Sequence, residues 1–294
     1  MKHDMCRGYQ NYLLIAPYML FFLLLTVLPV IVAIFLGFTD FNMLQQPNFI
    51  GWDNYTRMFL EDHIFIIALK NTLVFSLVTG PISYLMCFML AWMINDFNPR
   101  LRSFITAIFY IPALTGNIFI AWLYIFSPDQ YGIINGLLIR IGFLKEPIGW
   151  LTDSRYVLGI LILVQLWLGL GAGFLAFIAG LQGVDRSLYE AGAIDGIRNR
   201  FQELWYVTLP SMIPQLLFGA VMQIVASFSV SDVSIRLAGF PSTEYVGETM
   251  VTHIVDHGTI RYEMGYACAL ATFLFAMMFL FNRLVRRLLS GVGQ

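Results

Sequence analysis

Long uncharged, apolar stretches recur along the whole chain. A helix needs about 20 predominantly apolar residues to cross the hydrocarbon core of a bilayer, whereas a barrel strand needs only about ten. Six stretches reach the helical length, and helices satisfy their backbone hydrogen bonds internally in lipid. We therefore expect an all-α polytopic membrane protein with six transmembrane helices. The six stretches are bounded by residues 8–39, 71–95, 103–128, 156–184, 204–231 and 264–282.

The first stretch begins like a secretory signal, with Lys2 and Arg7 ahead of apolar residues. However, its uncharged run is far longer than the roughly 7–15 apolar residues of a signal peptide, and no small-residue cleavage site follows. We expect it to be retained as a membrane helix. Prolines within or beside the stretches predict kinks or helix ends. They are Pro17, Pro29, Pro81, Pro112 and Pro214.

The composition agrees with a lipid environment. Of the 294 residues, 59% are hydrophobic and 12% are charged, and the mean hydropathy is +0.74, whereas soluble domains carry about 25% charged residues. The net charge of −1 argues against a nucleic-acid partner, because binding phosphates requires a basic excess. Since no internal repeat or low-complexity linker divides the sequence, we interpret residues 1–294 as a single transmembrane domain.

The charge distribution predicts which side of the membrane each loop faces. An even number of spans places both termini on one side, and basic residues favour the cytoplasmic side. With the termini inside, ten of the 17 basic and six of the 18 acidic residues lie in inner segments, which leaves seven basic and twelve acidic residues outside. The basic cluster Arg283, Arg286 and Arg287 supports this orientation. We therefore expect both termini to be cytoplasmic.

The spans carry no obvious means of driving transport. Carriers coupled to protons or sodium commonly hold Asp, Glu or His within a span, yet none lies inside the six stretches. Such a carrier is disfavoured. A sodium-coupled carrier stays a minor alternative, because backbone carbonyls at broken helices can bind Na⁺ without a charged side chain. The chain also lacks the GxxxxGK[ST] phosphate loop of an ATP site. Energy for transport must then arrive from a partner at an inner connection.

The histidines and cysteines indicate neither a metal site nor an enzyme. Cys6, Cys87 and Cys268 are too dispersed for a disulfide framework or a zinc cluster. His253 and His257 are spaced i, i+4 but lack the glutamate of HExxH. We interpret this pair as solvated histidines of an acidic outer loop and expect no metal. Because no nucleophile or acid–base cluster gathers at one interface, we also expect no catalytic residue and no cofactor in this chain.

The connection between the fourth and fifth stretches has an organised pattern. Residues 188–194 have helix-forming composition, and Gly196 provides a position where the chain reverses with positive φ. Apolar residues at i, i+4, i+7 and i+8 then predict an amphipathic helix lying against the membrane domain. Pro210 disfavours helical geometry at Leu209 and predicts a break before the fifth span. The apolar residues are Ile197, Phe201, Leu204 and Trp205.

The first helix of this connection offers a nearly bare surface. Ala191, Gly192 and Ala193 have little or no side chain, and Glu190 and Asp195 flank them with charge. The backbone or groove wall of another protein can therefore approach closely. On composition alone, a plain solvated connection is the alternative interpretation.

The same connection closely resembles a known motif. Residues 189–196 (YEAGAIDG), followed by VTLP at 207–210 and by Pro214, resemble the EAA loop of permease subunits of binding-protein-dependent ABC importers. Much of the rest is similar to the sugar-type branch, and in particular to the larger permease of the maltose transporter. The further matching segments are 12–17, Pro29, 38–41, 49–55, 111–112, Trp122, 132–135, Tyr262, 265–267 and Ala269.

The resemblance implies a type I ABC importer permease fold that forms half of a translocation path for a sugar or oligosaccharide. It also implies a second permease subunit, two cytoplasmic ATPase subunits that bind ATP and Mg²⁺, an extracytoplasmic sugar-binding protein, and a prokaryotic inner membrane. The EAA-like loop, residues 185–210, would couple to the ATPase. The coupling residues implied are Glu190, Ala191, Gly192, Asp195, Gly196, Leu209 and Pro210.

The sequence departs from the family pattern in three places. The family more often has alanine where Gly192 and Ile197 stand. Residues 196–200 are one residue longer than usual, and residues 239–241 read Gly-Phe-Pro in place of Gly-Gly-Pro.

Uncharged polar and aromatic residues near mid-span are candidates for a sugar path, since sugars are bound by hydroxyl and amide groups and by flat aromatic faces. For each candidate, an interhelical hydrogen bond or an interfacial aromatic anchor is an equal alternative. The resemblance gives most weight to the fifth span, where we favour Gln223 and Ser229. The candidates are Asn117, Trp122, Gln165, Trp167, Gln223, Ser227, Ser229 and, at the outer end, Asp232.

Other functions stay open at this point. An ABC importer permease for a charged solute, such as an amino acid or phosphate, is the second interpretation, although its site would be expected to place ionisable groups in the spans. An ion-coupled secondary carrier ranks below it. A structural membrane subunit that transports nothing would leave the EAA-like loop unexplained.

Overall fold

The computed structural model describes residues 14–116 and 118–290. Within these residues the secondary structure is helical, apart from an isolated bridge between Thr39 and Phe49. Five helical segments are long and apolar enough to cross a membrane. They are Leu14–Leu36, His63–Asn95, Ser154–Gly183, Ile213–Ala238 and Met264–Arg287.

The third predicted span is not one continuous helix. Helices α5 (Pro99–Leu114) and α6 (Phe119–Ile125) meet at an angle of 86°. Pro112 removes a backbone donor near the end of α5, and Thr115 then adopts extended geometry with ψ of 104°. The kink or helix end predicted at Pro112 is therefore confirmed, and six spans result only when this bent pair counts as one.

Two other spans are interrupted without any proline. Helices α8 (Ser154–Leu168) and α9 (Ala172–Gly183) are separated at residues 169–171, and α13 (Ile213–Phe228) and α14 (Asp232–Ala238) at residues 229–231. By contrast, helix α4 (His63–Asn95) continues through Pro81. Prolines therefore mark some helix ends, such as Pro112 in the last turn of α5 and Pro214 in the first turn of α13, but not all of them, because glycine and serine at these breaks also release the backbone from helical geometry.

Two leucine–proline pairs are each preceded by one π-helical turn. The turns are η1 (Leu23–Val27), before Pro29 in α2 (Leu28–Leu36), and η2 (Leu204–Thr208), before Pro210. In each turn, the leucine preceding the proline donates its N–H to the carbonyl five residues back. A proline has no N–H and clashes with the carbonyl four residues back, so the wider turn carries the helix past it.

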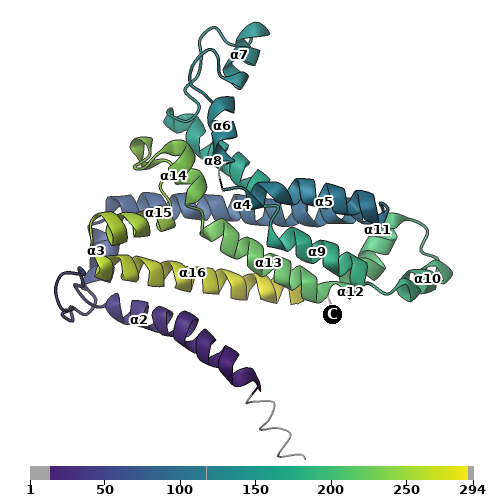
Figure 1. Cartoon of the computed structure of the whole chain (residues 1–294), viewed down its shortest axis with the longest axis horizontal. Coiled ribbons are helices and arrows are strands. Elements are labelled where there is room, and N and C mark those ends of the chain that lie inside the picture. Colours follow the sequence, from purple (N-terminus) through teal and green to yellow (C-terminus); the bar gives the residue numbers. More distant parts are fainter. Residues whose placement is uncertain (1–13, 117, 291–294) are drawn as a thin grey trace, which may run out of the picture. The chain divides into compact units, whose positions relative to one another are not determined.

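The chain divides into two compact units. The larger unit comprises Ile64–Thr252 together with the chain from Ala276 onward. Within it, α13 packs along α9 (Figure 1). Gly219 allows this close approach, because an added Cβ there would lie 2.4 Å from Cζ of the buried Phe177. Small residues of this kind let membrane helices approach each other closely.

Two hydrophobic cores stabilise the larger unit. The first gathers side chains of α6, α8 and α14, and the second gathers side chains of α4 and α9. The first includes Phe119, Phe126, Leu161, Val164, Val233 and Leu237. The second includes Cys87, Phe88, Phe174, Phe177, Leu181 and Leu204.

The smaller unit comprises the chain up to His63 together with His253–Phe275. Its helices include α3 (Asp53–Leu60), η4 (Asp256–Ile260) and the start of α16 (Met264–Ser290). The buried Asn54 donates hydrogen bonds of 2.9 Å to the carbonyls of Gly37 and Thr39. The N–H of Gly265 donates to the carbonyl of Phe41 at 2.8 Å. Segments 38–41, 49–55 and 265–267 of the family resemblance are thus packed together.

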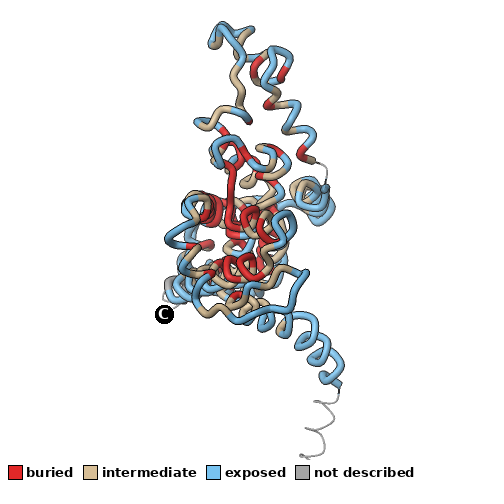
Figure 2. Tube along the Cα trace, turned by 90° about the vertical axis from the view of Figure 1, so that its left-hand side faces the viewer, coloured by how far each residue is buried: buried red, intermediate tan, exposed pale blue. Residues whose placement is uncertain are grey.

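The helical segment Leu14–Leu36 leaves its large apolar side chains exposed, and it is pale blue over most of its length in Figure 2. A helix that is apolar on all sides is stable only in lipid or against other helices. The exposure therefore agrees with the prediction that this segment is a membrane helix.

The structure contradicts the prediction that His253 and His257 are solvated. Their side chains are only 1% and 2% exposed. His253 lies at the end of α15 (Met250–Val255), and its Nε2 is 2.8 Å from Oδ2 of Asp62. Burial lowers the pKa of His257, although a hydrogen bond with Glu263 opposes this shift. The sequence does not reveal that Asp62 lies against these histidines, because Asp62 is 191 residues away from His253.

Candidate functional site

The EAA-like loop begins with a well-capped helix, α10 (Arg186–Ile194). The carboxylate of Asp185 accepts the N–H of Ser187 at 3.0 Å, and this hydrogen bond holds the pKa of Asp185 below its usual value. At the other end, Gly196 has φ of +95°, and the N–H of Ile197 donates to the carbonyl of Gly192 at 2.9 Å. This arrangement is a Schellman termination. The predicted helix and the predicted reversal at Gly196 are both confirmed.

A second helical segment follows the turn without a break at Leu209. It consists of α11 (Arg200–Glu203), η2 and α12 (Leu209–Ser211). Leu209 has helical φ and ψ of −59° and −48°, and helical geometry is interrupted only at Met212, with φ of −104° and ψ of 11°. The expectation of non-helical geometry at Leu209 is wrong, because the π turn of η2 accommodates Pro210. The predicted break before the fifth span is confirmed, and it lies at Met212.

The two helical segments of the loop pack directly against each other at Gly192. An added Cβ at this glycine would lie 2.9 Å from Cδ1 of Ile197 and 3.3 Å from Cγ2 of Val207. Gly192 is therefore buried inside the loop, and only Ala191 and Ala193 are exposed. The prediction that all three small residues form one bare surface is wrong for Gly192. The missing methyl group at Gly192 makes room for the larger Ile197, which explains why both positions depart from alanine together.

The second segment is only partly amphipathic in the predicted way. Leu204 and Val207 are buried, but Phe201 and Trp205 are 70% and 65% exposed. The prediction that the whole stripe packs against the membrane domain is therefore wrong for Trp205, whereas the ring of Phe201 contacts that of Trp92 on α4, with centroids 5.6 Å apart. Residues 197–199 are not helical, and α11 begins only at Arg200, so a regular 3.6-residue period does not hold across 197–205.

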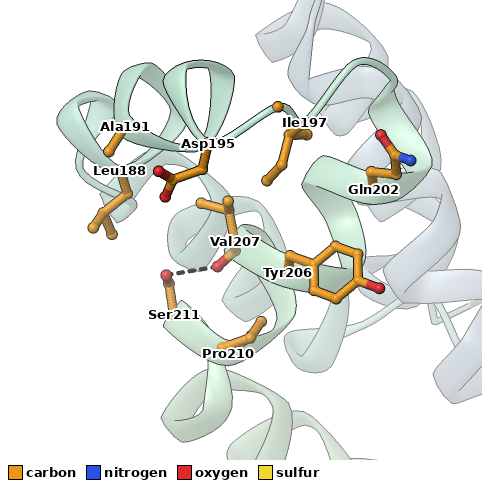
Figure 3. Close-up of a pocket in the computed structure, with 11 residues that line it drawn as sticks. Leu188, Ala191, Asp195, Ile197, Gln202, Tyr206, Val207, Pro210 and Ser211 are labelled. Carbon is orange, nitrogen blue, oxygen red and sulfur yellow. Dashed lines mark hydrogen bonds between the residues drawn. The ribbon is translucent and has the colours of Figure 1, made fainter.

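A groove of about 560 Å³ lies between the two segments. Figure 3 shows Leu188, Ala191 and Asp195 projecting from α10, with Val207 and Tyr206 from the second segment. Ser211 also lines the groove, and its hydroxyl donates to the carbonyl of Val207 at 2.7 Å. The groove combines apolar walls with the exposed carboxylate of Asp195.

An ion pair fastens the loop to the end of α4. The guanidinium of Arg200 pairs with the carboxylate of Asp96 and lies 4.7 Å from the ring centroid of Trp92. The hydroxyls of Tyr189 and Thr208 are 3.1 Å apart and connect α10 to the second segment. The sequence prediction missed Asp96 and Trp92. The available signal was opposite charge, since Asp96 and Arg200 fall in two connections predicted on the same side of the membrane.

Comparison with known proteins identifies the family. The sequence profile described as "Binding-protein-dependent transport system inner membrane component" matches residues 84–294. The chain belongs to this family. The permease is 31% identical to the probable ABC transporter permease protein YesP of Bacillus subtilis over 265 residues, which cover 89% of this chain and 84% of YesP. It is 29% identical to the arabinooligosaccharides transport system permease protein AraP of the same organism, over 95% of this chain and 88% of AraP.

Solved structures share the fold. A chain of a bacterial ABC transporter involved in the import of the acidic polysaccharide alginate aligns with a TM-score of 0.77, at 24% identity and over 99% of both chains. A chain of the alginate transporter in complex with a periplasmic protein bound to alginate pentasaccharide aligns with a TM-score of 0.78, at 22% identity. The predicted type I ABC importer permease fold is thus confirmed, and the chain is a multi-pass membrane protein.

Two predicted path residues of the permease are engaged within the chain. Gln223 is buried, and its Nε2 donates to the carbonyl of Gly169 at 3.0 Å and contacts Sγ of Cys87 at 3.2 Å. Ser227 is also buried, and its hydroxyl donates to the carbonyl of Ile224 at 2.9 Å. Gln223 therefore connects α13 to α4 and to the break between α8 and α9. Sequence reasoning did not find the partners of Gln223, because a thiol and a backbone carbonyl carry no recognisable motif.

The other predicted path residues lie in different surroundings. The rings of Trp122 and Trp167 meet edge to face with centroids 5.3 Å apart. Gln165 is partly exposed on α8, whereas Ser229 and Asp232 are exposed where α13 and α14 separate. Asn117 lies outside the described residues. The structure thus brings the two tryptophans together, and the assignment of all these residues to a transport path stays a prediction.

Proposed function

We propose that this permease imports a sugar or oligosaccharide, driven by ATP hydrolysis in partner subunits. Relatives named for arabinooligosaccharide transport and fold neighbours named for alginate import support a carbohydrate substrate. The six predicted spans contain no ionisable side chain at their centres, which suits a neutral, hydroxyl-rich substrate better than a charged amino acid or phosphate.

The geometry of the EAA-like loop is the main support for this proposal. Helix α10 ends in a fixed reversal at Gly196, and the groove beside it is open to a partner. Glu190 is exposed on α10, and none of the described residues pairs with its side chain. An ATPase subunit docked there would move α10 as a rigid element, and the Arg200–Asp96 ion pair would transmit the movement to α4.

We infer the partner subunits from this loop together with the family to which the chain belongs. Two cytoplasmic ATPase subunits would bind ATP and Mg²⁺ and contact Glu190, Ala191, Asp195 and Gly196, while Gly192, Leu209 and Pro210 would hold the shape of the loop. A second permease subunit would complete the path, and an extracytoplasmic binding protein would deliver the substrate. Both termini and the EAA-like loop would then face the cytoplasm of a prokaryotic cell.

The Trp122–Trp167 pair is our candidate for stacking against sugar rings, because aromatic faces bind the C–H groups of sugars. Gln165 would add an amide group from α8, Asn117 stays a candidate from the sequence, and Ser229 and Asp232 would line the path between α13 and α14. Gln223 and Ser227 would hold the helices around this path in position, through the hydrogen bonds that they make within the chain.

The proposal is tested by substitutions in the loop. Glu190→Lys reverses a charge at the ATPase contact, and Gly196→Pro is incompatible with φ of +95° because proline fixes φ near −65°. We expect both variants to insert into the membrane and to lose substrate-stimulated ATP hydrolysis in the reconstituted complex, as measured by phosphate release.

The controls are the same two changes in the connection between α7 (Ile133–Arg140) and α8. Glu146→Lys reverses the charge of an exposed carboxylate, and Gly142→Pro replaces a glycine with φ of +76°. Both controls should keep the stimulation. Stimulation at the wild-type level in Glu190→Lys and Gly196→Pro would contradict the assignment of the loop.

A further inference from the structure

Two histidines and an aspartate converge inside the smaller unit. His253 comes from the end of α15, His257 from η4, and Asp62 from the residue before α4. Their side chains are 1%, 2% and 11% exposed. Oδ2 of Asp62 lies 2.8 Å from Nε2 of His253 and 3.8 Å from Nε2 of His257. One potential ligand atom from each residue lies within 4.8 Å of the other two.

A surrounding set of side chains orients these three residues. Nδ1 of His257 is 2.7 Å from Oε2 of Glu263, and Arg57 holds the same oxygen at 2.9 Å. The hydroxyl of Tyr266 donates to Oδ2 of Asp62 at 2.7 Å. Histidines that bind metals usually direct their other ring nitrogen at a carboxylate, and such partners fix the orientation of the ring. The Glu263–His257 pair has this arrangement.

The backbone conformation between His257 and Glu263 brings these two side chains together. Tyr262 has φ of 59°, a left-handed conformation that is strained for a non-glycine residue and that clusters at functional sites. The reversal brings Glu263 back to η4, where its N–H donates to the carbonyl of His257 at 2.8 Å. His257 itself stands in a π-helical turn, which is also a frequent feature of functional sites.

The hydrogen bonds leave two acceptors near each other. An ionised Glu263 accepts only, so Nδ1 of His257 must carry the proton of their hydrogen bond. In the neutral ring, Nε2 is then an acceptor, and it lies 3.8 Å from the acidic Oδ2 of Asp62. A cation between these two atoms would be bound by both of them, and binding it would displace the proton shared by His253 and Asp62.

We propose that Asp62, His253 and His257 bind one divalent transition-metal ion, with Zn²⁺ the expected occupant, through Oδ2 and the two Nε2 atoms. Imidazole and carboxylate ligands suit zinc, and three protein ligands leave a fourth position for water. A tetrahedral ion with bonds of about 2.0–2.2 Å holds its ligand atoms roughly 3.3–3.5 Å apart. The two Asp62 distances, 2.8 and 3.8 Å, lie on either side of this range.

A surface pocket of about 580 Å³ lies in the smaller unit beside the three ligands. It is lined in part by residues that contact these ligands, and further carboxylates at its wall attract cations. The residues that line it include Arg57, Glu263, Tyr266, Asp40, Asp53 and Glu61. The ion would join the residue before α4 to the segment that contains α15 and η4, so it would stabilise this unit.

The test is metal binding to the full-length chain, purified in detergent with an affinity tag that contains no histidine and stripped with a chelator. We expect Co²⁺ to bind with a stoichiometry of one and to give the visible absorption of a four-coordinate ion, and Zn²⁺ to displace it. His253→Gln and His257→Gln should lose this band. His63→Gln removes an exposed histidine next to Asp62 and should keep it.

A further variant keeps the test decisive if the ligand variants fold poorly. Glu263→Ala retains all three ligands but releases His257, and we expect affinity for Zn²⁺ to fall about 10–100-fold, as when other outer partners of metal ligands are removed. Absence of the Co²⁺ band in the wild-type chain would overturn the proposal, whatever the variants do. Binding in His253→Gln and His257→Gln that equals the wild type would overturn it as well.

Discussion

At the scale of single residues, buried polar groups matter most where their partners are backbone atoms. Gln223 donates to the carbonyl of Gly169 in the break between α8 and α9, where helix geometry cannot satisfy that carbonyl. Leaving a buried polar group without its partner costs about 1–3 kcal/mol. Gln223 therefore does for this break what a backbone hydrogen bond does inside a helix.

We predict that Gln223→Leu lowers the stability of the permease by about 1–3 kcal/mol, seen as a lower melting temperature in detergent. Ser229→Ala serves as the control, because Ser229 is exposed at the end of α13 and its loss should leave the melting temperature unchanged. If Gln223→Leu melts like the wild type but no longer transports, Gln223 contacts the substrate instead.

At the scale of elements, the connection of the EAA-like loop to α4 should affect coupling more than stability. Both side chains of the Arg200–Asp96 pair are about half exposed, at 48% and 52%. Exposed pairs contribute about 0–1 kcal/mol, and an exposed cation–π contact such as Arg200 on Trp92 adds about 0.5–1 kcal/mol. Their geometry nevertheless fixes where the loop begins its second helical segment.

We therefore predict that Arg200→Glu, which places two carboxylates together, reduces substrate-stimulated ATP hydrolysis while the melting temperature changes by only a few degrees, as about 1 kcal/mol implies for a chain of this size. Combining it with Asp96→Arg should restore part of the stimulation, because the ion pair is then reversed but present. If the double variant has as little stimulated ATP hydrolysis as Arg200→Glu, or if Arg200→Glu alone keeps full stimulation, this ion pair does not take part in coupling.

The elements also show how far the sequence predicts the structure. Hydrophobic runs locate the spans, and Gly196 locates the reversal, because each depends on local chemistry. Pro112 predicts a kink or helix end, but the angle of 86° between α5 and α6 and the continuity of the helix at Leu209 are not predictable in this way. They depend on whether a neighbouring turn widens or the chain extends near a proline, and packing decides between these outcomes.

The candidate sites differ in the same respect. The EAA-like loop is contiguous in sequence, so its residues and its helix–turn–helix form could be predicted. The Asp62–His253–His257 cluster could not be, because a loop histidine and one lying against a distant carboxylate have the same local sequence. Only the fold brings Asp62 to the histidines.

At the scale of the whole molecule, the orientation in the membrane decides whether the EAA-like loop can reach a cytoplasmic ATPase. The basic cluster Arg283, Arg286 and Arg287 ends α16, and the inner segments hold an excess of basic residues, which are retained on the cytoplasmic side. With both termini inside, Ala193 of α10 must lie in the cytoplasm and Lys145 of the connection before α8 must lie outside.

We predict that a membrane-impermeant maleimide labels Lys145→Cys in intact right-side-out spheroplasts, but labels Ala193→Cys only after the membrane is permeabilised. Both positions are exposed, so access to the reagent and not burial decides the labelling. The background carries Cys6→Ser and Cys268→Ser, whereas the buried Cys87 is kept for its contact with Gln223. Labelling of Ala193→Cys from the outside would place α10 away from any cytoplasmic partner, and the coupling role proposed for Glu190 and Gly196 would then be excluded.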